Sequence, residues 1–217
     1  MQNSKLEVAK FSFNVFEVNT YLIFDNKTNE AWIIDPGNSN EFEDDELERF
    51  IRDKNLMITK ILNTHGHIDH VYGVKFIKNH FNADYYFPSP DYEFLKNIKL
   101  QAEMIGVSAP QVVEPDFDLH SFDSLTLGEH EIKIIKTPGH SPGGICCAID
   151  GEKKIIVGDL IFKENIGRTD LWGGDFNTLI NSVKEKILIY PEDYELLPGH
   201  GPSTTVHHEK LNNPFFK

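Results

Sequence analysis

Four side chains that can bind a metal ion lie within six residues of the chain: His65, His67, Asp69 and His70. They follow an apolar stretch typical of a β-strand, residues 58–63, and precede a stretch with helical spacing of apolar residues. Imidazole nitrogens and carboxylate oxygens are the ligands that zinc and similar divalent ions prefer. His65 and His67 are close enough in sequence to bind one ion, and Asp69 and His70 can bind a second. The cluster predicts a metal site at the end of a strand.

Three further candidates each follow a glycine near the end of an expected strand: His140, Asp159 and His200. Glycine lets backbone segments approach closely, and side chains at strand ends can point into one opening at the edge of the sheets. The carboxylate of Asp159 can bridge two ions, because each of its oxygens bonds separately. Seven ligands divided over two ions leave room for a bridging water. Such an open arrangement is typical of catalytic rather than structural sites.

The rest of the chain predicts the elements that position these residues. Strand patterns cover residues 8–15, 21–25, 31–35, 58–63, 83–87, 121–125, 131–137, 144–149, 154–157 and 195–197. Helix patterns cover residues 41–54, 69–81, 91–105 and 176–187. Each half of the chain is therefore expected to contain several antiparallel strands with helices. We expect a single α/β domain over residues 1–217, built from two similar halves.

The segment Thr64-His65-Gly66-His67-Ile68-Asp69-His70, with His140, Asp159 and His200, resembles the hallmark of the metallo-β-lactamase superfamily. The likeness extends from the Asp-Pro-Gly at 35–37 to the Pro-Gly-His-Gly at 198–201. It implies an αββα sandwich, with two mixed sheets flanked by helices and a dinuclear site at one edge. It also implies that His65, His67 and His140 hold one ion, that Asp69, His70 and His200 hold the other, and that Asp159 bridges them. Two divalent ions per chain are expected, with zinc first and iron or manganese as alternatives.

Three further segments resemble one branch of this superfamily. Residues 158–162, 166–170 and 173–175 are similar to the glyoxalase II-like (hydroxyacylglutathione hydrolase-like) branch, especially its short bacterial members. True β-lactamases usually carry a signal peptide, and several use a cysteine where this chain has Asp159, so that activity is not expected. Only residues 201–217 follow His200. We therefore expect no C-terminal helical domain of the kind with which long glyoxalase II enzymes hold glutathione.

The expected reaction is hydrolysis of a small thioester similar to a hydroxyacyl-glutathione. A water that bridges two divalent ions has its pKa lowered from about 15.7 to about 7, so hydroxide is available to attack the carbonyl. A thiolate leaving group, with a conjugate-acid pKa of about 8.5, needs little help from a general acid. Asp69 can orient the nucleophile. Asp69 and Asp159 are therefore the expected catalytic carboxylates.

Alternative functions remain open on the same residues. Persulfide dioxygenases carry a related Gly-Arg-Thr-Asp segment, and such an enzyme would use a single iron on His65, His140 and Asp159. A lactonase or phosphodiesterase reaction is another alternative, as is a metal-stabilised binding module without activity. Bound iron with oxygen uptake would identify the dioxygenase, and full inertness of the metal-loaded protein would identify the binding module.

Arg168 is the candidate substrate-binding residue outside the ligand set. It can pair with a substrate carboxylate or with Asp170, and the second alternative, which would hold the loop, is favoured because such pairs are common. Asp35 is expected to hydrogen-bond a ligand histidine or to cap its turn. Three aromatic residues nearby either line an apolar pocket or, as is more common, belong to the core: Phe162, Trp172 and Phe176.

Charge and composition exclude several classes of partner. The 21 basic and 34 acidic residues give a formal net charge of −13, so neither nucleic acid nor a membrane is an expected partner. The apolar runs are too short to span a bilayer, and residues 1–10 lack the apolar segment of a signal peptide. A cytoplasmic protein is expected, as a monomer or homodimer, with Cys146 and Cys147 as reduced thiols.

Overall fold

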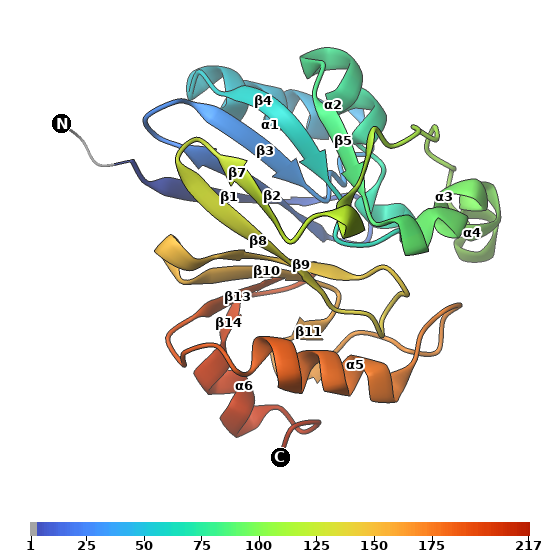
Figure 1. Ribbon diagram of the computed structural model, residues 1–217. Coiled ribbons are helices and arrows are strands. Elements are labelled where there is room, and N and C mark those ends of the chain that lie inside the picture. The colour runs from blue at the N-terminus through green and yellow to red at the C-terminus, as the bar shows by residue number, and fades with distance from the viewer. Residues whose placement is uncertain (1–3) are drawn as a thin grey trace.

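Two six-stranded sheets pack face to face, and helices cover their outer faces (Figure 1). The computed structural model describes residues 4–217. The first sheet consists of β1 (Leu6–Phe13), β2 (Val18–Asp25), β3 (Glu30–Ile34), β4 (Met57–Leu62), β5 (Asp84–Phe87) and β6 (Phe117–Asp118), in that order. The second has the order β14 (Thr204–Thr205), β13 (Glu195–Pro198), β10 (Lys154–Gly158), β9 (Ile145–Ile149), β8 (His130–Lys136) and β7 (Ser124–Leu127). A small hairpin, β11 (Ile161–Phe162) with β12 (Asn165–Ile166), follows β10.

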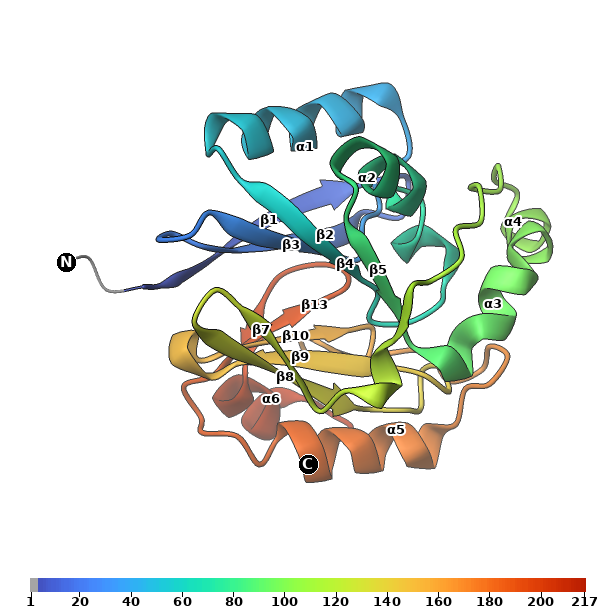
Figure 2. The same cartoon turned by 45° about the horizontal axis from the view of Figure 1, so that its top comes forward.

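The helices form the two outer layers. Figures 1 and 2 show α1 (Glu41–Asp53) and α2 (Val74–Phe81) over the first sheet, and α5 (Phe176–Ser182) and α6 (Val206–Asn212) over the second. The short helices α3 (Tyr92–Lys96) and α4 (Ile98–Ile105) lie together at one end of the sandwich. This four-layer arrangement confirms the expected αββα sandwich with mixed sheets.

Three groups of buried apolar residues hold the layers together. One lies between the first sheet and α1 and α2, where Leu47 and Ile77 are fully buried. A second lies between the two sheets and includes Trp32 and Cys147, and a third packs α5 and α6 against the second sheet. Burial of such apolar surface contributes about 25 cal/mol per Å², so all four layers depend on these contacts. Both cysteines are free and buried, as expected.

The expected mixed sheets combine antiparallel pairs with parallel ones. The pairs β3–β4, β4–β5 and β5–β6 are parallel, and so is β10–β13. Parallel strands need a crossover connection, and α1, α2 and α5 lie in such connections. The helices return the chain to the same end of the sheet each time. The carboxyl ends of β4, β10 and β13 therefore reach one shared edge.

Two expected helices are interrupted. The pattern over 69–81 divides into a 3₁₀ turn, Ile68–His70, and α2, because the Gly73 N–H donates to the Pro36 carbonyl (2.8 Å) outside the helix. The stretch 91–105 divides at Asn97 into α3 and α4. The sequence did not predict α6, whose first turn is capped by the Thr205 side chain.

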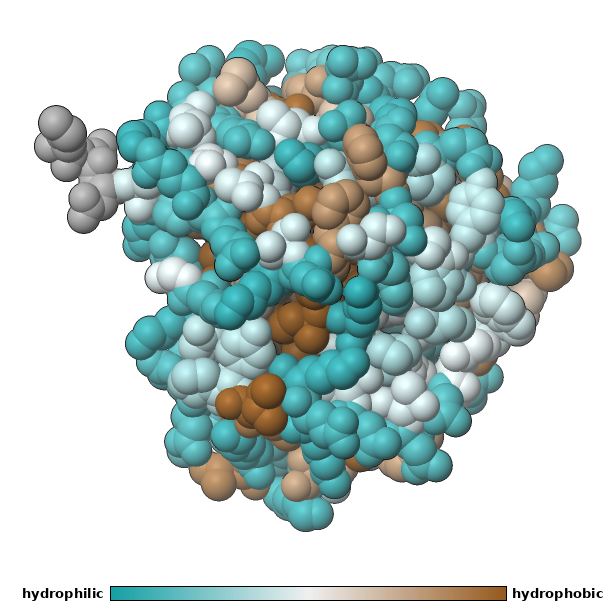
Figure 3. All heavy atoms as spheres, in the orientation of Figure 1, coloured by the Kyte–Doolittle hydropathy of each residue, from teal (hydrophilic) through white to brown (hydrophobic). Residues whose placement is uncertain are grey.

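The face seen in Figure 3 carries mainly hydrophilic side chains, with apolar ones in small separate groups. Among residues 4–217, no helix combines the length and the apolar character needed to cross a bilayer.

Candidate metal centre

The seven candidate ligands meet at one edge of the sandwich. His65 and His67 follow β4, and Asp69 and His70 lie in the 3₁₀ turn that comes next. The other three follow strands of the second sheet: His140 follows β8, Asp159 follows β10 and His200 follows β13. Because these strands end at the same edge, segments far apart in sequence converge there.

His65, His67 and His140 form the first group. One ring nitrogen of each lies within 4.8 Å of the others. The closest pair is His140 Nε2 and His67 Nδ1, 2.8 Å apart. All three side chains are buried. They are the residues that the family resemblance assigned to one ion.

Asp69, His70 and His200 form the second group, with ligand atoms again within 4.8 Å of one another. His200 Nε2 lies 3.1 Å from Asp69 Oδ2, and His70 Nε2 lies 3.6 Å from the same oxygen. His70 also belongs to a third buried group, with Asp35 and His65.

Asp159 stands between the two groups. Its Oδ1 lies 3.5 Å from His70 Nε2, and its Oδ2 lies 3.5 Å from His200 Nε2 and 3.7 Å from His140 Nε2. A Cβ at Gly199 would come within 2.1 Å of Asp159 Oδ1, so only glycine fits beside this carboxylate. The geometry suits a carboxylate that bridges two ions.

The unpaired polar atoms of the cluster show that divalent ions fit it. His65 Nε2, His70 Nε2 and Asp159 Oδ1 are buried and have no hydrogen-bond partner within the described chain, and the same holds for His67 Nε2. Buried polar atoms are normally paired, so a convergent group of unpaired ones is suited to hold a cation.

The outer nitrogens of two ligands are fixed by main-chain carbonyls. His140 Nδ1 donates to the Arg168 carbonyl (2.8 Å), and His200 Nδ1 donates to the Phe16 carbonyl (2.9 Å). A hydrogen bond at Nδ1 selects the tautomer whose Nε2 has a free lone pair. In both residues that lone pair faces the cluster.

The electrostatics of the cluster favour metal binding. Burial, and then the neighbouring His140, lowers the pKa of His67 to about 3, and burial likewise lowers the pKa of His65 well below its usual value. Burial alone would raise the pKa of Asp69 and Asp159, but the charge of His70 holds both below the ordinary range. Neutral imidazoles and ionised carboxylates are the forms that bind metal ions.

The pKa of His70 shifts in the opposite direction from those of His65 and His67. Burial would lower its pKa, but Asp69, Asp159 and Asp35 together raise it well above the usual value. The three carboxylates therefore favour a positive charge at His70. Either a proton on His70 or a metal ion bound to it satisfies them.

Asp35 has the supporting role expected of it. Its carboxylate lies 3.0 Å from His70 Nδ1 and accepts hydrogen bonds from the Thr64 N–H (2.7 Å) and hydroxyl (2.6 Å). It thereby ties the turn after β3 to the start of the ligand segment, and it places a carboxylate beside His70.

Asp91 is a buried supporting residue that the sequence did not reveal. Its carboxylate accepts from the Gly66 N–H (2.9 Å) and from the Gly143 N–H (2.5 Å). Gly66 lies between His65 and His67, and Gly143 lies in the loop that carries His140. Asp91 therefore connects the two segments that supply the first group. An acidic residue at the start of an expected helix usually indicates a cap, so the sequence carried no signal for this role.

Arg168 approaches the site through its main chain. Its guanidinium makes two hydrogen bonds to Asp170, both 2.9 Å long, and both side chains are exposed. This geometry matches the favoured alternative, in which the pair holds the loop. The substrate-binding role of Arg168 remains a prediction.

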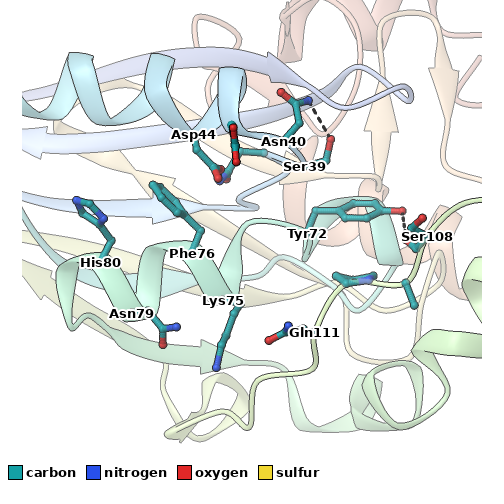
Figure 4. Close-up of a pocket in the computed structure, with 14 residues that line it drawn as sticks. Ser39, Asn40, Asp44, Tyr72, Lys75, Phe76, Asn79, His80, Ser108 and Gln111 are labelled. Atoms are coloured by element: carbon teal, nitrogen blue, oxygen red, sulfur yellow. Dashed lines mark hydrogen bonds between the residues drawn. The ribbon is translucent and has the colours of Figure 1, made fainter.

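A hollow of about 660 Å³ lies elsewhere, between the start of α1, α2 and the loop over 106–116 (Figure 4). The Tyr72 hydroxyl donates to the Ser108 carbonyl at its rim (2.9 Å). None of the seven candidate ligands lines this hollow. It is therefore separate from the metal centre.

The four-layer fold and the histidine–aspartate centre together define a metal-dependent hydrolase class. The chain belongs to the metallo-β-lactamase superfamily, because the model of that family matches residues 13–209. The resemblance stated from the sequence is thus confirmed.

Three individual proteins are similar to the chain over almost its whole length. The chain is 37% identical over 204 residues to a protein of Haemophilus influenzae named hydroxyacylglutathione hydrolase GloC, covering 92% of this chain and 93% of that one. It is 31% identical to the crystal structure of BLEG-1, described as a B3 metallo-β-lactamase, with a TM-score of 0.89 and coverage of 97% and 100%. It is 29% identical to TTHA1623, solved in a di-iron-bound form, with a TM-score of 0.84 and coverage of 96% and 100%.

Proposed function

We propose that this protein hydrolyses a small thioester of the hydroxyacyl type, at a centre that holds two divalent ions. The observation that carries the proposal is the 37% identity, over 92% of the chain, to a hydroxyacylglutathione hydrolase. The convergence of seven ligand side chains supports it. The proposed substrate is a small molecule, and neither nucleic acid nor a membrane is a proposed partner.

Each residue of the centre has a defined task in this proposal. His65, His67 and His140 would hold one ion, Asp69, His70 and His200 the other, and Asp159 would bridge them. When bound, the two ions supply Lewis acidity and a water activated at neutral pH. Asp69 orients the attacking water by accepting its hydrogen bond. The thiolate departs with little proton transfer, so no general acid is required.

Elemental mass spectrometry on protein purified without added metal or chelator tests the centre. About two equivalents of zinc per chain are the expected result, and a panel of thioesters then tests the reaction. The di-iron form of TTHA1623 makes iron the first alternative metal. One equivalent of iron with oxygen consumption on a persulfide would replace the proposal by a dioxygenase. No bound metal, and none taken up on titration, would overturn it.

β-Lactam hydrolysis is a second candidate, because BLEG-1 shares 31% identity over almost the whole chain. A chromogenic cephalosporin assayed beside the thioesters decides between them. We expect kcat/KM for the best thioester to exceed that for the cephalosporin by a wide margin, and the reverse order would make the second candidate correct. A lactone and a phosphodiester in the same panel cover the remaining alternatives.

The proposed location is the cytoplasm, and the proposed assembly is a monomer or a homodimer. Cell fractionation and light scattering of the purified protein test these two points.

A further inference from the structure

A row of aromatic rings extends from the metal centre to the surface. Phe94 of α3 packs edge-on against His67, with ring centroids 4.9 Å apart, and Trp172 packs edge-on against Phe94 at the same separation. Phe94 is 5% exposed, whereas Trp172 is 60% exposed. The row therefore begins at a candidate ligand and ends in an indole that is open to solvent.

The segment that carries Trp172 is tied to the loop of His140. Asp175 N–H donates to the Gly139 carbonyl (2.8 Å), and the Gly174 N–H closes a turn on the Leu171 carbonyl (3.0 Å). Gly173 has φ +76, and a Cβ there would come within 2.6 Å of the Pro142 ring. Figures 1 and 2 both show this segment, between β12 and α5, beside α3. Trp172 therefore has a fixed position relative to the first ligand group.

The charges near Trp172 do not favour an anionic substituent. Arg168 is the only basic residue in the segment 167–175, and its guanidinium is already occupied by both oxygens of Asp170. The whole chain carries a net charge of −13. What the segment offers a ligand is the open face of an indole, which gains free energy when apolar surface covers it.

We propose that Trp172, packed on the buried ring of Phe94, forms an apolar wall of the substrate site, and that the preferred thioesters carry an aromatic or branched apolar substituent. This inference rests on the proposed thioester hydrolysis. The reacting carbonyl must lie beside the ligands, and both substituents of a thioester extend from it. A substituent on the side of His67 lies against Trp172, whose indole is supported by the buried ring of Phe94. Large exposed aromatic residues at such positions often carry much of the binding energy.

Specificity kinetics test the wall. The substrates are a pair of lactoyl thioesters with S-benzyl or S-methyl groups, and a second pair with S-methyl and either a phenyl or a methyl acyl substituent. In the pair that the wall contacts, Trp172→Ala should reduce the preference for the aromatic substrate by roughly tenfold. If the effect appears in the first pair, the wall contacts the thiol side of the substrate; if it appears in the second, the wall contacts the acyl side. Trp172→Phe should restore most of the preference. Phe176→Ala is the matched control and should leave it unchanged, because this half-exposed ring packs on Phe215.

Tryptophan fluorescence gives a readout that does not depend on turnover. The chain has two tryptophans; Trp32 is fully buried and Trp172 is mostly exposed, so quenching by acrylamide reports mainly on Trp172. The probes are non-hydrolysable thioether analogues of both substrate pairs, added to the metal-loaded protein. In the pair that the wall contacts, the analogue with the aromatic group should protect Trp172 against quenching, and the analogue with the methyl group should protect it much less. The signal should persist in Phe176→Ala and be lost in Trp172→Phe.

The outcomes separate this inference from the proposed function. If thioesters are hydrolysed but Trp172→Ala keeps the wild-type preference in both pairs, the wall is wrong and the proposed function stands. If no thioester is hydrolysed, the proposed function fails, and the fluorescence protection alone decides the wall. Equal protection by the aromatic and methyl analogues in both pairs would overturn it.

Discussion

At the residue scale, the ligands depend on partners that sequence spacing does not show. His140 and His200 are oriented by main-chain carbonyls of residues 168 and 16. A carbonyl is present whatever side chain occupies the position, so no residue type marks this role. The ligands themselves were predictable, because the His-x-His-x-Asp-His cluster between an expected strand and an expected helix is a demanding pattern, and the other three ligands each follow a glycine near a strand end. Their partners were not.

Removal of one ligand tests the first group. We expect His67→Ala to bind less metal and to lose hydrolysis of the best thioester, because without this imidazole only two of the three histidines of the first group remain. Elemental mass spectrometry and the thioester assay measure the two effects. His207→Ala is the matched control, since this exposed histidine contacts only Glu192 among the groups described. Wild-type turnover in His67→Ala would show that the site assignment is wrong.

Asp91 is expected to act as a positioning residue for the same group. In Asp91→Asn only one side-chain oxygen remains, so it can accept from Gly66 or from Gly143 but not from both, and one of the two ligand segments loses its connection. We expect metal affinity, measured by chelator competition, to fall roughly 10-fold to 100-fold, as for other residues that support ligands. The absorption spectrum of the cobalt-substituted protein should change as well.

A purely structural role for Asp91 would give a different result. The melting temperature of the metal-free variant would then fall, while the affinity for metal and the cobalt spectrum stayed as in the wild type. That combination would contradict the positioning role.

At the element scale, strand patterns were predicted more reliably than helix boundaries. The apolar stretches gave the long strands to within a few residues, because their side chains pack on both faces. The break at Gly73 depends on a contact with a distant segment, the Pro36 carbonyl. The parallel pairs likewise depend on where each helix returns the chain. Neither kind of information is present in a local pattern.

The loop between β12 and α5 provides a prediction at this scale. The Arg168–Asp170 pair is exposed, so its loss should lower the stability of the fold only slightly. The Arg168 carbonyl that orients His140 remains in Arg168→Ala. We therefore expect Arg168→Ala and Asp170→Ala to alter KM and melting temperature slightly and to the same extent. Steady-state kinetics and thermal unfolding measure both. A rise in KM in Arg168→Ala alone would show that the guanidinium binds substrate.

At the scale of the whole molecule, the centre joins segments from both sheets. His70 lies next to β4, whereas Asp159 and His200 follow β10 and β13. An ion shared by these residues connects the two halves of the sandwich in the folded state only. The sequence predicted both the sandwich and the ligand set, since the family resemblance covers the chain. The side-chain packing between the two sheets, by contrast, was visible only in the structure.

Metal removal should therefore lower the stability of the entire fold. A ligand that binds only the folded state, at 100 times its Kd, stabilises that state by about 2.7 kcal/mol. For a chain of this size, 1 kcal/mol shifts the melting temperature by roughly 2–4 °C. We expect a chelator to lower the melting temperature by roughly 5–10 °C per ion lost, and added zinc to restore it. Because His67→Ala lacks a ligand of the first ion, chelation should shift its melting temperature less than that of the wild type. An unchanged melting temperature, after elemental analysis has verified removal of the metal, would mean that the ions contribute nothing to joining the two sheets.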